Sequence, residues 1–247
     1  MSVRKLFTPA LLFSLTLLCA APALAQADAR AQAAADIESL RGQIKSKEAV
    51  LLSTSAEDRR AYADFLALPR TGLVRLLPRE KWDGKLSTRG GGAFYSFSRR
   101  THEYGRGDDV ELAQDELSVG FAGADFGFML NLGDAPLETV SVETEGVGFA
   151  ASFKAPTLEP EARAAYRSFG DLAGRRDGEF VYKSRLPVSL GSTYVVRSIS
   201  YDDSDVLVAF RVLRKDSDGS VVLLWKMLEE FPKPKLERNV IAAAGSQ

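Results

Sequence analysis

The only histidine of the chain, His102, lies in residues 98–109, the most polar and varied stretch of the part of the sequence that is predicted to form strands. Because an imidazole titrates near neutral pH, His102 is the first candidate for acid–base chemistry. A catalytic triad also needs a serine nucleophile and an orienting carboxylate, for which Glu103, Asp108 and Asp109 are available nearby. No Gly-x-Ser-x-Gly motif identifies the serine. The simpler interpretation is a loop imidazole that hydrogen-bonds to its neighbours.

The same stretch and the residues before it offer side chains that could bind a ligand without catalysis. Trp82, beside the Asp83-Gly84 turn, could stack on a ligand, although an indole that anchors its loop in the core is the more common arrangement. Arg89 and the glycines at 90–92 could present charge and backbone N–H groups to an anion, but no Walker lysine or following helix accompanies them. The remaining binding candidates are Arg99, Arg100, Tyr104 and Arg106.

The composition excludes several classes of site. The 247 residues include one cysteine and one histidine, too few for a Cys/His zinc cluster, a haem or iron–sulfur centre, or a disulfide framework. The acidic turns at 202–205 and 216–219 do not complete a calcium-binding loop, so we expect no metal and no cofactor. A formal net charge of −1 also argues against nucleic acid as a partner. A glycosidase-type carboxylate pair stays open among 33 acids.

The N-terminus has the pattern of a cleavable signal peptide. Basic residues at 4–5 precede an apolar run at 6–19, and Ala23-Leu24-Ala25 supplies the small residues that a signal peptidase recognises. We therefore expect cleavage before Gln26. A membrane anchor would need about 20 apolar residues, more than this run provides, and a lipoprotein would need a small residue in place of Leu18. The expected product is an exported protein, periplasmic or extracellular, with no transmembrane segment.

The segment after the expected cleavage site is predicted to be helical. Residues 27–52 are rich in Ala, Glu, Lys, Gln and Arg. Lys47 falls on the apolar stripe and Gly42 interrupts it, which favours one amphipathic helix over a coiled coil. Ser55 resembles the N-cap of a second helix, which Pro69 ends. The apolar residues of the first helix recur at helical spacing, and they are Ile37, Leu40, Ile44 and Leu51.

From residue 72 onward, short runs with apolar residues at every second position alternate with Gly, Asp, Ser and Pro clusters, which indicates strands and turns. Runs at 110–112 and 117–121 flank a polar segment and predict a hairpin. The segments 205–214 and 220–228 are apolar at both alternating sets of positions, which is typical of central strands covered on both faces. The other expected strands include 126–132, 147–153, 179–185 and 193–200.

One further helix is expected near 160–169, where Pro160 stands at a first helical position, and a polar loop is expected at 171–178. The strand at 126–132 is nearly bare on one face because of its glycines, which favours close packing by another segment over a ligand. The count of about eleven strands predicts a mostly β fold, either a β-sandwich or a curled barrel-like antiparallel sheet, with the N-terminal helices against it.

The predicted organisation is a signal peptide at 1–25, a helical segment at 26–68, a β-rich domain at 69–231 and an irregular tail at 232–247. Without a catalytic motif, a non-catalytic binding or structural protein of the bacterial-type envelope or exterior is favoured, with a glycan, another envelope component or a protein as its partner. Two alternatives stay open. One is a hydrolase of envelope polymers or esters that uses His102 or a carboxylate pair, and the other is assembly through helix pairing between subunits.

Overall fold

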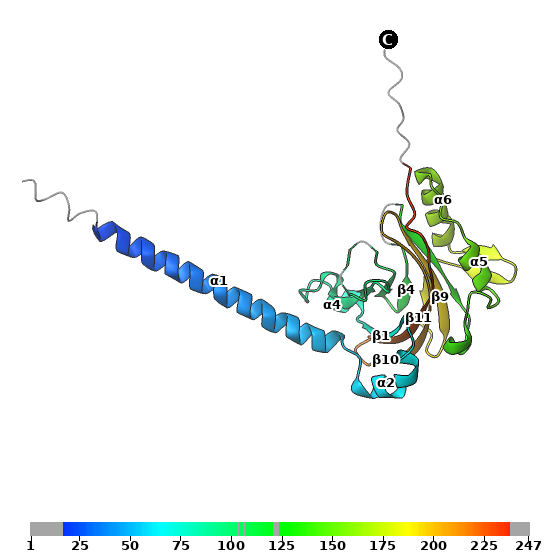
Figure 1. The fold of residues 1–247 in the computed structure, drawn as a ribbon, viewed down its shortest axis with the longest axis horizontal. Coiled ribbons are helices and arrows are strands. Elements are labelled where there is room, and N and C mark those ends of the chain that lie inside the picture. Colours follow the sequence, from blue (N-terminus) through cyan, green and yellow to red (C-terminus); the bar gives the residue numbers. More distant parts are fainter. Residues whose placement is uncertain (1–16, 103, 106, 121–123, 238–247) are drawn as a thin grey trace, which may run out of the picture. The chain divides into compact units, whose positions relative to one another are not determined.

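The computed structural model describes residues 17–102, 104–105, 107–120 and 124–237 (Figure 1). The chain divides between Lys47 and Glu48 into two compact units. In the first unit the described residues belong to the long helix α1 (Leu17–Leu52), whose last turn lies in the second unit. Most of the predicted signal peptide, residues 1–16, and the end of the predicted tail, residues 238–247, lie outside the described residues.

The helices that precede the β-strands agree with their sequence pattern. Helix α1 confirms the helix expected over 27–52. Helix α2 (Ala56–Ala61) is capped by Ser55, whose Oγ accepts a hydrogen bond from the backbone N–H of Asp58 at 3.0 Å, and α3 (Ala63–Leu66) ends before Pro69. In the second unit the buried carboxylate of Glu48 accepts hydrogen bonds from Ser87 and Thr88, which fixes the last turn of α1 there.

Three antiparallel sheets contain the eleven strands of the described residues, and none of these sheets closes into a barrel. The five-stranded sheet has the order β1 (Thr71–Leu76), β11 (Val221–Glu230), β10 (Ser204–Lys215), β9 (Thr193–Ser200), β5 (Phe126–Asn131). The four-stranded sheet has the order β2 (Phe94–Tyr95), β3 (Val110–Ala113), β4 (Glu116–Ser118), β8 (Arg185–Pro187). The small sheet pairs β6 (Arg175–Asp177) with β7 (Phe180–Tyr182). The mostly β, sandwich-like fold is confirmed.

Short helices connect the strands. They are α4 (Arg79–Trp82), η1 (Arg89–Gly92), η2 (Leu137–Thr139), α5 (Val147–Ser152) and α6 (Glu159–Gly170). Figure 1 shows α5 and α6 on one side of the five-stranded sheet, and the four-stranded sheet with α4 on its other side. The helix expected near 160–169 is confirmed as α6, with Pro160 in its first turn.

The large sheet is covered on both faces, as the sequence of its central strands predicts. In β10, Val208 and Phe210 belong to the apolar cluster that includes residues of the four-stranded sheet. Leu207 and Ala209, which alternate with them, belong to the cluster that includes residues of α5 and α6. Because alternate side chains of a strand point to opposite faces, β10 must be apolar at both sets of positions.

Two segments differ from their prediction. Residues 147–152 form helix α5 and not a strand: Gly146 turns the chain with a φ of 80°, and Val147 and Ala150, spaced by three, are the buried residues of the helix. The alternation of apolar residues there could not distinguish a helix of one and a half turns from a strand. Residues 175–177 lie within the predicted polar loop but form the exposed strand β6. This strand has no alternation of apolar residues from which it could be predicted.

Close packing explains the glycines that interrupt the strands. A Cβ added at Gly127 would lie 2.3 Å from Cγ2 of Val119 and 2.5 Å from the carbonyl oxygen of Arg197, so other segments of the same chain pack closely on β5 at this glycine, as predicted. The hairpin of β3 and β4 is also confirmed, with Gln114 and Asp115 at positive φ in the two-residue turn. These connections bring β4 beside β8 and set the edge of the cleft described below.

Candidate functional site

His102, the first candidate from the sequence, is held by structural contacts. Its Nε2 lies 2.9 Å from the carbonyl oxygen of Arg75, and its ring packs edge-on against Tyr95 with 5.2 Å between centroids. Burial lowers the pKa of His102, which favours the neutral imidazole. Among the described residues, no hydrogen bond joins His102 to Asp108 or Asp109. Glu103 and Arg106 lie outside those residues.

Two arginines of this stretch contact residues far along the chain. Arg99 forms an ion pair with Asp203, and the guanidinium of Arg100 lies 5.4 Å from the ring centroid of Trp225. Among the named binding candidates within the described residues, Tyr104 alone lines the large cleft discussed below. It packs against Phe94 with 4.6 Å between ring centroids.

Trp82, the aromatic candidate for stacking, ends helix α4 and is half-buried. Its Nε1 is buried and has no hydrogen-bond partner in the structure described. The backbone of Trp82 lies against Gly91. A Cβ added at Gly91 would lie 2.5 Å from the backbone nitrogen of Asp83. The glycines at 90–92 therefore permit close packing of η1 on α4, and Trp82 is not among the residues that line the large cleft.

Asp108 and Asp109, the last two residues of this stretch, form a buried acidic pair. Asp109 is fully buried, with Oδ2 accepting the N–H of Phe97 at 2.7 Å and Oδ1 without a hydrogen-bond partner among the described residues. Burial raises the pKa of Asp109 to about 7 and that of Asp108 to about 6. Asp108 lines a hollow of only about 30 Å³ beside Gly105 and Ser198. That volume suits one water molecule rather than a substrate.

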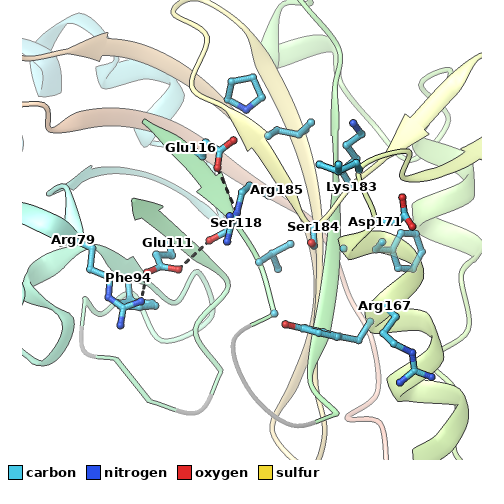
Figure 2. Close-up of a pocket in the computed structure, with 18 of the residues that line it drawn as sticks. Arg79, Phe94, Glu111, Glu116, Ser118, Arg167, Asp171, Lys183, Ser184 and Arg185 are labelled. Atoms are coloured by element: carbon cyan, nitrogen blue, oxygen red, sulfur yellow. Dashed lines mark hydrogen bonds and ion pairs between the residues drawn. The ribbon is translucent and has the colours of Figure 1, made fainter. Parts of the chain in front are cut away.

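The large cleft is the site with room for a ligand. It has a volume of about 820 Å³ and lies between the four-stranded sheet and α6 (Figure 2). Strands β4 and β8 form one wall, where Ser118 lies opposite Arg185 in the register. The C-terminal part of α6 forms the other wall, since the buried Ala162 and Phe169 orient that helix. The size is within the range of pockets that bind small molecules.

The wall on the sheet side contains a chain of charged contacts. Arg79 Nη1 donates to Glu111 Oε1 at 2.8 Å, and Ser118 Oγ donates to Glu111 Oε2 at 3.0 Å. Glu116 pairs with Arg185 at 3.5 Å (Figure 2). These contacts neutralise both glutamates and fix the sheet wall.

The opposite side of the cleft carries two cations, Arg167 and Lys183, against one carboxylate, Asp171, a formal net charge of +1. Four cationic side chains and three carboxylates line the cleft in total. Arg167, on α6, and Lys183, between β7 and β8, have no side-chain hydrogen bond or ion pair with the described residues, whereas Asp171 accepts the N–H of Ala173 at 2.9 Å. An anion that enters this cleft would meet two available cations.

The aromatic side chains add an apolar surface to the cleft. Tyr104 is half-buried and Tyr166 is 41% exposed. A ligand with both an apolar face and a negative charge would therefore find complementary groups.

The cleft offers binding groups more clearly than catalytic groups. Ser118 is hydrogen-bonded to Glu111, and Arg79 engages the other oxygen of the same carboxylate, so Glu111 is occupied by structural contacts. No cluster of three or more His, Cys, Asp or Glu side chains that could hold a metal ion occurs in the described part of the chain.

The sequence did not identify Arg167, Lys183 and Arg185 as site residues. They belong to α6 and to the segment around β8, far from the 98–109 stretch, and each stands in an ordinary polar context. Only the pairing of β8 with β4 brings this segment to the cleft. No short motif could have indicated them.

Comparisons with known proteins give no match. No protein-family model, no curated protein and no solved structure matches the chain. Within the described residues, no helix has the length and hydropathy required to cross a membrane.

Proposed function

We propose that this protein is an exported, non-catalytic binding protein whose cleft takes an acidic glycan or a similar anionic component of a bacterial-type envelope. The observation that carries the proposal is the pair of available cations, Arg167 and Lys183, in a cleft of about 820 Å³ with tyrosines in its walls. A sugar ring that bears a carboxylate presents an apolar face to an aromatic ring and a charge to a cation. Such charge-assisted contacts are the stronger class of hydrogen bond.

The cleft predicts a preference for charge over sugar identity. A uronic acid tetrasaccharide and its methyl ester have nearly the same size, and isothermal titration calorimetry compares their affinities. We expect the acid to bind at least tenfold more tightly, because a hydrogen bond to a charged group contributes about 1.5 to 3 kcal/mol. The double variant Arg167→Ala/Lys183→Ala should lose that preference.

A matched double variant controls for the change in net charge. Lys154→Ala/Arg176→Ala also removes one lysine and one arginine, and both residues are exposed and outside the cleft lining. It should bind the acid with unchanged affinity. Equal affinities for the acid and the ester, or an equal loss in both double variants, would contradict an anion site in the cleft.

Export is supported by the N-terminal sequence alone, and mass spectrometry tests it. After expression of the full chain in a bacterium, we expect protein outside the cytoplasm that begins at Gln26. Ala25→Tyr should block this processing, because a signal peptidase needs a small residue there, while Leu24→Tyr should leave it intact. A cytoplasmic protein that retains residues 1–25 would exclude the exported role.

A further inference from the structure

Helix α1 presents an apolar stripe that its own unit does not cover. Every residue from Gln26 to Lys47 is exposed, and these include Ile37, Leu40 and Ile44, with exposed fractions of 50%, 56% and 49%. Helices in proteins gain most of their stability from packing of an apolar face. A helix of this length with an uncovered stripe of large aliphatic residues is therefore incomplete by itself.

The spacing of the stripe corresponds to a coiled-coil heptad. Ile37 and Ile44, seven residues apart, take the a positions, and Leu40 takes the d position between them. One turn earlier, Ala33 takes a d position. β-Branched residues at a with leucine at d favour two parallel strands. Arg30 at a and Lys47 at d are charged, so they limit the apolar seam to residues 33–44.

The charges beside the seam fit a second copy of the same helix. In this register Asp36 is a g position and Arg41 is the following e position. In a parallel, in-register pair, the g residue of one helix faces the next e residue of its partner, so Asp36 meets Arg41 of the other copy twice by symmetry. Both side chains are exposed, and within the helix Asp36 accepts from Gln32 at 2.8 Å while Arg41 lies 3.7 Å from Glu38.

An antiparallel pair would be less favourable. In the antiparallel register that layers Ile37 on Leu40, Arg30 is placed opposite Lys47 at both ends of the seam. In the register that layers Leu40 on Ile44, the e positions place Arg41 against its own copy. Both arrangements bring like charges together, and neither pairs Asp36 with Arg41 across the seam.

We infer that two copies of the chain associate through α1 as a parallel, in-register coiled coil centred on Ile37, Leu40 and Ile44. The seam is short, so the association is expected to be weak and dependent on concentration. Gly42 and Lys47 argue against a long coiled coil in the sequence, but the register of the short seam places Gly42 at an f position, on the outer side of the pair, so it weakens the helix without breaking the seam.

Sedimentation equilibrium of the purified full-chain product, from low micromolar to near-millimolar concentration, tests the association. We expect a monomer–dimer equilibrium whose dissociation constant rises at least tenfold in Leu40→Asp. Ala35→Asp is the control, because it places the same side chain on the outer f position of the same helix. A monomer at every concentration, or a dimer that survives Leu40→Asp, would overturn the inference.

The charged pair tests the orientation. Asp36→Arg and Arg41→Asp should each weaken the dimer severalfold, because each single change places like charges across the seam. The combined variant exchanges the two charges and should restore the dimer, and failure to restore it would overturn the parallel register. Sedimentation needs no glycan, so its outcome is independent of ligand binding in the cleft.

Discussion

We expect Asp205→Ala to lower the free energy of unfolding by about 3 to 5 kcal/mol, the range for removal of one partner from a buried ion pair. Asp205 and Arg197 are 4% and 1% exposed, and their two contacts are 2.5 Å and 2.9 Å. Arg197 also donates to the carbonyl of Ala150 at 2.9 Å and packs against the ring of Phe231. Without Asp205, this guanidinium remains buried without its directly bonded counter-charge, and only the more distant Glu229 acts on it.

Urea denaturation measures the effect, and a second variant separates charge from packing. Arg197→Met/Asp205→Leu removes both charges and keeps most of the volume, so it should recover most of the lost stability. A loss below about 1 kcal/mol in Asp205→Ala would mean that the pair is solvated, as exposed pairs are.

The second large effect concerns pH. Because the pKa of Asp109 is about 7 in the folded chain against 3.8 for the ordinary group, folding takes up a proton between these values. The contribution of Asp109 to stability is therefore fully present below about pH 4 and is lost as the pH rises through about 7. Asp108, with a pKa of about 6, acts in the same direction.

Asp109→Asn keeps an acceptor for the N–H of Phe97 but has no charge to bury. Denaturation at several pH values should give nearly equal stabilities for the variant and the parent protein at about pH 4. At about pH 8 the variant should be more stable by about 2 to 4 kcal/mol, since each pKa unit corresponds to about 1.4 kcal/mol. A variant that is less stable at both pH values would show that Asp109 is ionised and stabilised in the folded chain.

The sequence predicted the strands whose burial leaves a periodic pattern. In β10 and β11 both faces are covered, and the apolar residues at both alternating sets of positions report this directly. It failed at Val147–Ser152, because a helix of six residues is too short for its period to differ from that of a strand. It also missed β6, whose residues are exposed and charged.

The site was less predictable than the fold. The polar residues at 98–109 made that stretch the predicted site. The partners of its side chains, however, depend on the topology of the fold. Most of these side chains make structural contacts. His102 binds the backbone of Arg75, and Arg99 pairs with Asp203, 104 positions later. Of the named binding candidates within the described residues, Tyr104 alone reaches the cleft, where its neighbours come from α6 and β8. A single sequence does not reveal the strand pairing that brings Tyr104, α6 and β8 to the same cleft.

Chemical-shift mapping of backbone amides tests the central claim most directly. Titration with the uronic acid tetrasaccharide should shift the amides of β4, β8 and residues 166–172, and should leave those of β1 and α2 unchanged. The shifts should disappear in Arg167→Ala/Lys183→Ala and persist in Lys154→Ala/Arg176→Ala. An absence of shifts near the solubility limit of the ligand, or shifts confined to segments outside the cleft, would contradict a binding function for this site.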